Sequence, residues 1–277
     1  MNYDHAFHAG NFADVLKHAV LTALLRAMTA GRRRLTVIDT HAGAGIYDLS
    51  ADAASRTGEA VAGVRLLMAD TGAPAIFDDL KAEVRRANRG EELRWYPGSP
   101  LVIAGLLRPG DSLIACELRP DAHAALEGLL PHHTGAEILA ADGWEIARRR
   151  ALRAPAPLLV IIDPPFERGD DREKLAEAVA AIPRLNPGAV IAAWVPIKDL
   201  AGFDDLVGAV EDAAAGAPLL IAETRQRTLA DPTRMNGCAM LVANPPPGFE
   251  AAAASAARWV AGTSTEPGAA GRAWFVR

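Results

Sequence analysis

The stretch from Leu158 to Phe166, LLVIIDPPF, constrains the fold of this chain more than any other. Its run of apolar residues is typical of a strand buried inside a parallel sheet. The two prolines that follow cannot donate to a strand ladder, so the strand has to end at Asp163. We therefore expect Asp163 at the carboxyl end of a central strand, where open α/β sheets bind their ligands.

The residues that end this strand suit the methylation of an exocyclic amine. The lone pair of an amine such as adenine N6 is delocalised into the ring, which makes the nitrogen a poor nucleophile. The Asp163 side chain and the Pro164 carbonyl can each accept one N–H hydrogen bond and thereby aim the lone pair at an electrophilic methyl group. The Phe166 ring would stack on the base. A simple turn that ends the strand is the alternative interpretation of this short motif.

A second proline run, from Asn244 to Pro247, also follows an apolar segment. It has no aromatic residue in the position that corresponds to Phe166. The sequence therefore predicts a structural turn at this place and a candidate site at the first run.

The composition argues against several classes of protein. No apolar run approaches the roughly 18 residues that span a bilayer, and the N-terminus lacks a signal-peptide pattern, so we expect a cytoplasmic protein without a membrane partner. Cys116 and Cys238 lie far apart in apolar runs, which predicts buried free thiols and no metal site.

The net charge of −5 argues against general polyanion binding. Local arginine clusters can still hold an RNA backbone, and they lie at 32–34, 85–89 and 148–153.

Short apolar strands alternate with segments of helical periodicity along most of the chain. Asn11 is a suitable N-cap for a first helix that begins at Phe12. The last two strands have no helical length between them and are expected to form an antiparallel pair at the edge of the sheet. This order predicts an α/β fold with a Rossmann-like sheet. Strands are expected at residues 35–39, 112–118, 135–142, 158–162, 189–195, 218–225 and 238–245.

One interval departs from this alternation. The second strand follows the first after about 70 residues, which is too long for a single loop. Helical periodicity at residues 61–68 and 76–87 indicates a small helical insertion. We therefore divide the chain into a main domain, residues 1–45 and 96–277, and an insertion subdomain, residues 46–95.

Several positions near strand ends are candidates for binding a nucleoside cofactor. The loop THAGAG, residues 40–45, lets the backbone approach a ligand, but it lacks the third glycine of the dinucleotide fingerprint, which disfavours an NAD enzyme. Glu117 ends the second strand, where an acid binds the ribose hydroxyls of an adenosine. Asp142 ends the third strand and can accept the amine of an adenine. Ser99 is expected to cap a helix whose N-terminus points towards this pocket.

Taken together, these segments resemble the RlmJ family of bacterial 23S ribosomal RNA (adenine-N6)-methyltransferases. The resemblance covers almost the whole chain and is carried by HAFHAGNFADVLKH, DTHAGAGIYDL, SRTGE at residues 55–59, RWYPGSP, Glu117, ADG and DPPF. The N-terminal and YPGSP segments are the most specific, because a general methyltransferase needs neither. The resemblance implies a Rossmann-like class I S-adenosylmethionine-dependent methyltransferase with a small helical insertion after the first strand.

The resemblance also implies roles for individual residues. Asp163 would be the catalytic residue at the adenine amine, while Tyr3 would meet the RNA, and Pro164 and Phe166 would contact the target base. The family pattern is DPPY, so Phe166 keeps a stacking ring but lacks the hydroxyl group. S-adenosylmethionine would be contacted by His18, His41, Ser99, Glu117, Asp142 and Gly143.

The implied function is methylation of N6 of one adenine in 23S rRNA, adenine 2030 in the family, by a monomer. A DNA adenine-N6 methyltransferase would share the motif and the fold, but the sequence shows no separate target-recognition domain. A glutamine-methylating enzyme would use a similar tetrapeptide on a protein amide. A cofactor-binding ribosome assembly factor, in which catalysis is incidental, is the alternative from another class.

Overall fold

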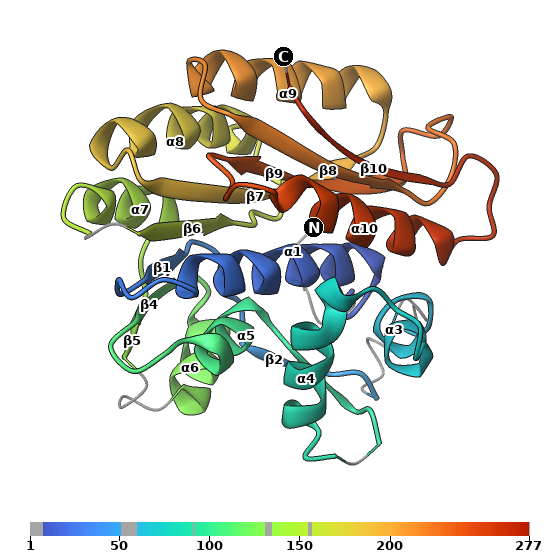
Figure 1. Ribbon diagram of the computed structural model, residues 1–277, viewed down its shortest axis with the longest axis horizontal. Coiled ribbons are helices and arrows are strands. Elements are labelled where there is room, and N and C mark those ends of the chain that lie inside the picture. Colours follow the sequence, from blue (N-terminus) through green and yellow to red (C-terminus); the bar gives the residue numbers. More distant parts are fainter. Residues whose placement is uncertain (1–7, 51–59, 91, 131–134, 155–156, 277) are drawn as a thin grey trace.

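An eight-stranded sheet runs through the centre of the molecule (Figure 1). The computed structural model describes residues 8–50, 60–90, 92–130, 135–154 and 157–276. The strands lie side by side in the order β10-β8-β9-β7-β6-β1-β4-β5. They span β1 (Thr36–Asp39), β4 (Ser112–Cys116), β5 (Ala136–Leu139), β6 (Leu158–Ile162), β7 (Ala189–Ile197), β8 (Leu219–Arg225), β9 (Gly237–Ala243) and β10 (Ala270–Phe275).

Neighbouring strands from β5 to β7 are parallel, so their carboxyl ends meet at one edge of the sheet. The chain leaves β1 towards β4 and β5 and then returns to β6 on the other side of β1. This reversal makes the space between β1 and β6 the topological switch point, where α/β sheets bind ligands. The alternation of strands and helices confirms the Rossmann-like α/β fold that the sequence predicts.

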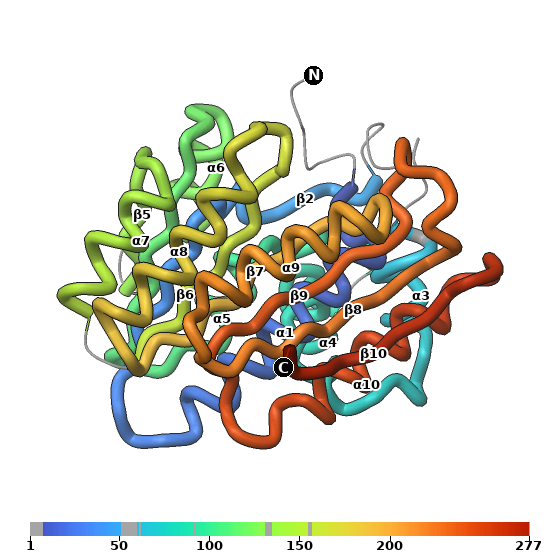
Figure 2. The backbone as a smooth tube through the Cα atoms, turned by 90° about the horizontal axis from the view of Figure 1, so that it is seen from above, coloured from blue at the N-terminus to red at the C-terminus, as the bar shows by residue number. Residues whose placement is uncertain are grey.

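Helices cover both faces of the sheet, and the two layers are visible in Figure 1. Seen from above in Figure 2, α7, α8 and α9 lie over the strands on one face of the sheet. The opposite face is covered by α1, α5 and α10. No helix in the described ranges is long and apolar enough to cross a membrane. The helices span α1 (Phe12–Thr29), α5 (Ser99–Leu106), α6 (Pro120–Leu129), α7 (Gly143–Ala151), α8 (Asp171–Leu185), α9 (Leu200–Ala214) and α10 (Phe249–Gly262).

Strand β6 shows why the central apolar run forms a strand buried on both faces. Leu159 and Ile161 belong to the core under α1 and α10. Leu158, Val160 and Ile162 belong to the core under α7, α8 and α9. All five side chains are buried, which explains why the run is continuously apolar instead of alternating.

The segment after β1 contains a two-stranded ribbon and short helices. Strands β2 (Ile46–Asp48) and β3 (Trp95–Pro97) pair antiparallel and enclose the helical part. The helices pack on α1 and α10, where the Trp259 indole N–H donates to Asp70 at 2.7 Å. The helicity predicted for this segment is present, while its treatment as a separate subdomain of residues 46–95 stays a prediction. The helical pieces are η2 (Val61–Arg65), α3 (Leu66–Ala69), η3 (Ala75–Phe77) and α4 (Asp78–Ala87).

The C-terminal strands differ from the expectation in one respect. Strands β8 and β9 are antiparallel to each other as predicted. However, β9 is inserted between β7 and β8, and β10 forms the edge of the sheet beyond β8. The predicted edge position of the pair was therefore wrong. The fully buried pattern of β9, with every residue inaccessible, agrees with its inner place.

Candidate active site

Four acidic residues meet at the carboxyl edge of the parallel strands. Asp39, the last residue of β1, is in register with Ala115 of β4 and Ile161 of β6. The residues that follow these strands therefore lie at the same level of the sheet. The other three acids follow neighbouring strands: Glu117 comes directly after β4, Asp142 lies beyond β5, and Asp163 comes directly after β6.

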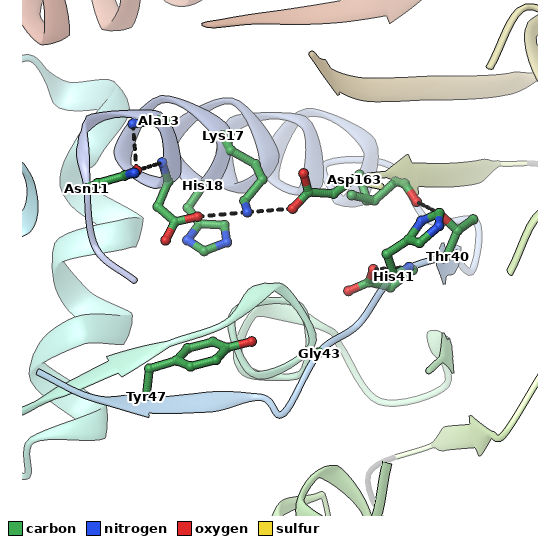
Figure 3. Close-up of polar contacts among 12 residues, drawn as sticks. Asn11, Ala13, Lys17, His18, Thr40, His41, Gly43, Tyr47 and Asp163 are labelled. Carbon is green, nitrogen blue, oxygen red and sulfur yellow. Dashed lines mark hydrogen bonds and ion pairs between the residues drawn. The ribbon is translucent and has the colours of Figure 1, made fainter. Parts of the chain in front are cut away.

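Asp163 is held by a lysine from the first helix (Figure 3). The Lys17 ammonium donates to Oδ2 of Asp163 at 2.6 Å and lies 2.8 Å from Oδ1 of Asp14. Oδ2 of Asp14 in turn accepts from the Gly10 backbone N–H at 2.9 Å. The Lys17 and Asp14 side chains are almost fully buried, and that of Asp163 is 18% exposed. Asp163 therefore presents a fixed carboxylate to the edge of the sheet.

The charge of Lys17 follows from its two carboxylate neighbours. Burial alone would lower the pKa of Lys17, but the attraction of Asp14 and Asp163 outweighs burial and holds the pKa well above its ordinary value. Lys17 consequently stays protonated at neutral pH. Loss of this cation would leave two carboxylates close together in a poorly solvated place.

The loop after β1 is anchored to the neighbouring strand. The Thr40 backbone N–H and hydroxyl both donate to the Ile161 carbonyl, at 3.0 and 2.9 Å. The hydroxyl also lies 2.7 Å from Nδ1 of His41, whose ring meets the Trp144 ring edge-on. Burial lowers the pKa of His41 to about 4, against the opposing effect of Asp163 and Asp142. The imidazole is therefore neutral at neutral pH.

The glycine loop closes on Glu117. The Gly43 N–H donates to Oε2 of Glu117 at 2.8 Å, and Oε1 accepts from the Arg119 N–H at 2.7 Å. Gly43 has a φ of 64°, and a Cβ at this position would collide with the Tyr47 hydroxyl. The loop thus needs glycine both for its backbone conformation and for the close approach of Tyr47.

Asp142 and Gly143 form the start of helix α7. Oδ1 of Asp142 accepts from the backbone N–H groups of Trp144 and Glu145, so Asp142 is the N-cap of the helix. A Cβ at Gly143 would collide with the Thr40 carbonyl. The β5 end and the β1 loop therefore touch through backbone atoms, and only glycine allows this contact.

Asp39 is a buried acid between these groups. Its side chain is inaccessible, Oδ1 accepts from the His41 N–H at 3.4 Å, and Oδ2 has no hydrogen-bond partner within the described ranges. Burial raises the pKa of Asp39 to about 6, since the Ser99 hydroxyl offsets burial only partly and Asp163 adds repulsion. The centre of the site therefore contains an acid that is poorly stabilised in its charged form.

Ser99 and His18 come from helices α5 and α1, which pack against each other. Ser99 is buried, but it is the first residue of α5 and Gly98 is the N-cap, so the predicted capping role of Ser99 was wrong. The Gly98 N–H donates to the Gly45 carbonyl at 2.8 Å, and this hydrogen bond fixes where the helix begins. His18 lies one residue after Lys17, with Nδ1 at 2.7 Å from the Tyr96 hydroxyl.

Pro164 and Phe166, which the sequence predicts to contact the target base, follow Asp163 closely in the chain. Pro164 is buried, and the Phe166 ring lies 6.1 Å from that of Trp194 with its backbone at a φ of 52°. Tyr3 lies outside the described residues. The structure thus brings Asp163, His41, Glu117, Asp142 and Gly143 to one edge of the sheet, with His18 on the helix that supplies Lys17.

Sequence reasoning missed the roles of Lys17, Asp14 and Asp39. Lys17 and Asp163 are 146 residues apart, so no local pattern links them. A usable signal was the presence of Asp14 and Lys17 in a first helix whose other residues are mostly apolar, FADVLKHAVLTALLRAMT. Ionic residues in such surroundings are rare unless they are paired.

The arginine clusters at residues 32–34 and 148–153 do not gather at the candidate site. Residues 32–34 precede β1 and therefore lie at the amino edge of the sheet, opposite Asp163. In the cluster on α7, Arg149 and Arg150 form ion pairs with Glu145 and Glu137. In the described part of the chain there is no group of three or more His, Cys, Asp or Glu side chains that could hold a metal ion.

Comparison with known proteins identifies the family. The family model described as "Ribosomal RNA large subunit methyltransferase D, RlmJ" matches residues 32–276. The chain belongs to the RlmJ family. The match includes β1 with its glycine loop, the ends of β4 and β5, and the DPPF segment. The resemblance expected from the sequence is thereby confirmed, and the protein is an enzyme of the ribosomal RNA large-subunit methyltransferase class.

Individual relatives agree with this assignment. The chain is 32% identical over 248 residues to Ribosomal RNA large subunit methyltransferase J of Escherichia coli, covering 89% of this chain and 88% of the relative. It is 31% identical over 247 residues to the protein of the same name from Haemophilus influenzae, with the same coverage. A crystal structure of a Legionella pneumophila protein superposes with a TM-score of 0.86 at 27% identity, covering 97% of this chain and 98% of the other.

Proposed function

We propose that this RlmJ-family enzyme transfers a methyl group from S-adenosylmethionine to N6 of one adenine in 23S rRNA, with Asp163 as the catalytic residue. The observation that carries the proposal is the Lys17–Asp163 pair at the end of β6, next to the glycine loop at the switch point of the sheet. The names of the two curated relatives support a large-subunit ribosomal RNA as the substrate. By analogy with the family, the target is the adenine at position 2030.

The residues at the edge of the sheet fit a cationic nucleoside cofactor. Asp39 has a buried oxygen without a hydrogen-bond partner among the described residues, and Glu117 and Asp142 lie at adjacent strand ends. Negative side chains favour a sulfonium group over a neutral thioether. Glu117 would hold the ribose hydroxyls, while Asp142 and Gly143 would contact the adenine. His18, His41 and Ser99 would complete the cofactor contacts. S-adenosylmethionine supplies an electrophilic methyl group when it is bound.

In this proposal, the protein contributes mainly position and charge. The Asp163 carboxylate and the Pro164 carbonyl each accept a hydrogen bond from one N6–H group. These two bonds turn the nitrogen lone pair towards the methyl carbon. N6 would become acidic as it gains the methyl group, and one of its protons would leave to water, with S-adenosylhomocysteine as the other product. Lys17 keeps the Asp163 carboxylate in place, which makes the hydrogen-bond acceptor rigid before the substrate arrives.

The target base would be held on the side of Phe166. Its ring is partly buried against Trp194 and offers a face for stacking in place of the tyrosine of the family pattern. The adenine has to leave its helical stack to reach Asp163, at an expense of a few kcal/mol. Tyr3 is proposed to contact the RNA. A monomer located in the cytoplasm remains the prediction from the sequence.

The experiment is transfer of labelled methyl groups to protein-free 23S rRNA, followed by nucleoside analysis. The wild type and an Asp163→Ala variant are compared, and cofactor binding is measured for both by calorimetry. N6-methyladenosine formed only by the wild type, with similar cofactor affinity in both proteins, is the expected result. Turnover by Asp163→Ala near the wild-type rate would remove the proposed catalytic role.

The same assay separates the alternatives from other classes. Duplex DNA and a protein extract are offered as substrates beside the RNA. Label in DNA or in a protein amide, with none in RNA, would replace the proposed substrate. Normal ribosome assembly in cells that carry only Asp163→Ala would favour an assembly role.

A further inference from the structure

The ribbon formed by β2 and β3 contacts both the glycine loop and helix α1. Its first strand follows Gly45 directly, and the Gly98 N–H donates to the Gly45 carbonyl at 2.8 Å. Tyr47 of β2 is directly opposite Tyr96 of β3. Opposite residues of an antiparallel pair point to the same face, so the two tyrosine side chains leave the ribbon on one side.

The ribbon is also fixed at its far end. Oδ1 of Asn88, which follows α4, accepts from the backbone N–H groups of Arg94 and Trp95, each at 2.8 Å. The Asn88 amide donates to the Trp95 carbonyl, and the Arg94 guanidinium pairs with Asp48 across the ribbon at 2.7 Å. A two-stranded ribbon is marginal alone, and these bonds make it a firm support.

Tyr96 acts on His18. The two rings are stacked with centroids 5.4 Å apart, and the Tyr96 hydroxyl lies 2.7 Å from Nδ1 of His18. Tyr96 is fully buried, and burial raises its pKa well above the ordinary value, with Asp14 adding to the shift. The hydroxyl keeps its proton and can donate a hydrogen bond to Nδ1, and in that arrangement the ring proton of His18 lies on Nε2.

Tyr47 acts on the glycine loop. The Ala44 N–H donates to the Tyr47 hydroxyl at 3.3 Å, and the same hydroxyl approaches Gly43 so closely that a Cβ there would collide with it. Gly43 is the residue whose N–H donates to Glu117. The position of the Tyr47 hydroxyl therefore sets the shape of the loop that faces Glu117 (Figure 3).

We propose that the β2–β3 ribbon is a positioning element of the cofactor site, in which Tyr96 fixes the ring orientation and tautomer of His18 and Tyr47 fixes the glycine loop. The inference rests on the proposed function, because it takes the loop and His18 as cofactor contacts. One rigid ribbon then aligns two walls of the site that come from different parts of the chain. The ribbon encloses the helical segment in sequence, so the insertion and the site share this support.

The test removes the hydroxyl groups one at a time with Tyr47→Phe and Tyr96→Phe, and together in the double variant. The matched control is Trp95→Phe, because successive residues of a strand point to opposite faces and Trp95 contacts Arg94 instead. Calorimetry with S-adenosylmethionine gives Kd, and methyl transfer at saturating cofactor gives kcat. Thermal melting reports whether each variant is folded.

Each single variant is expected to raise Kd by about three- to tenfold, the range of one lost hydrogen bond, with kcat changed by less than about twofold. Trp95→Phe should leave both values unchanged. Wild-type binding with equally tight binding by both tyrosine variants would overturn the inference. Absence of cofactor binding in the wild type would instead contradict the proposed function.

A measurement on the wild type tests the hydrogen bond between Tyr96 and His18 even if a variant does not fold. ¹⁵N NMR of the imidazole rings distinguishes a protonated from an unprotonated nitrogen, and the signals of His18 are assigned by their loss in His18→Gln. We expect an unprotonated Nδ1 and a protonated Nε2, with Nδ1 shifting in Tyr96→Phe but not in Trp95→Phe. A proton on Nδ1 in the wild type would refute the assignment of Tyr96 as donor.

Discussion

Two proline runs end strands in this molecule, and they lie at opposite edges of the sheet. Asp163 follows β6 at the carboxyl edge of the parallel strands. Asn244 follows β9, which runs antiparallel to β7 and therefore ends beside the beginning of β7. Both runs contain one residue in the left-handed region, Phe166 with a φ of 52° and Asn244 with a φ of 55°.

The polar groups of the two runs are used differently. The Asn244 amide donates to the carbonyls of Ala189 and Pro187, and its backbone N–H donates to Pro218, so it closes the backbone locally. Asp163 instead pairs with Lys17, which comes from helix α1, and its side chain remains partly exposed. Asparagine tolerates the left-handed region well, whereas an aromatic residue there is strained. Strain of this kind is typical of functional sites, and the Asn244 turn shows none.

Asp163→Asn should have the largest effect of any change in either run. The amide keeps one acceptor oxygen but loses the negative charge that faces Lys17 and the N6 hydrogens. We expect kcat for methyl transfer to fall by about a thousandfold, as for the loss of one well-placed catalytic hydrogen bond. Single-turnover kinetics with saturating cofactor and RNA measure this, and a fall of less than tenfold would argue against the role of the charge.

Lys17→Met should weaken the fold at the same run. The change keeps an unbranched apolar chain but leaves Asp14 and Asp163 without their shared cation. Removing one partner of a buried ionic group lowers the free energy of unfolding by about 4 kcal/mol. Urea unfolding at pH 7 measures the difference. The control is Lys198→Met, because Lys198 is exposed and has no ion pair among the residues that the structure describes. Equal stability of the two variants would contradict the importance of the buried pair.

The difference between the two proline runs could be predicted from the sequence. The contacts between distant elements that cause it could not. The missing aromatic residue after Asn244 and the long apolar run before Asp163 are local features, and the elements that they predict are present. The partner of Asp163 lies on another helix, and the inner position of β9 depends on how strands assemble. Strand β10 was missed because it is a partly exposed edge strand whose sequence, AGRAWF, contains no β-branched residue. Local patterns report local burial, and contacts between distant elements leave no such signal.

Asp39→Asn tests the edge of the sheet where Asp163 lies, through the pH dependence of stability. Asp39 is a buried acid at this edge, and its neighbours stabilise its charged form only in part. The folded-state pKa of Asp39 is about 6, above its ordinary 3.8. The native state therefore binds this proton more tightly, and the contribution of Asp39 to the stability of the wild type falls as the pH rises from about 4 to about 6. Asparagine does not titrate, so the stability difference between variant and wild type should grow by about 3 kcal/mol across this window and stay constant above it.

Urea unfolding at several pH values between 3.5 and 8 measures this change. Asp199→Asn serves as the control, because Asp199 is a half-buried acid that caps α9 by accepting from the Gly202 N–H. A difference for Asp39→Asn that stays the same at all pH values would mean that the carboxyl group is stabilised by contacts other than those described. Any constant offset reflects the packing of the new amide and does not bear on the prediction.

Asn244→Asp tests the structural run, and we expect the smallest effect there. The new carboxylate would face the Ala189 and Pro187 carbonyls, so two donated hydrogen bonds become repulsive contacts. The left-handed backbone is retained, because aspartate tolerates it nearly as well as asparagine. Unfolding free energy should fall by about 1–2 kcal/mol, while kcat stays at the wild-type value. Asn244→Gly removes the same hydrogen bonds without the charge and should lose less stability. If Asn244→Asp lowered kcat as Asp163→Asn does, the two edges of the sheet could not be functionally separate.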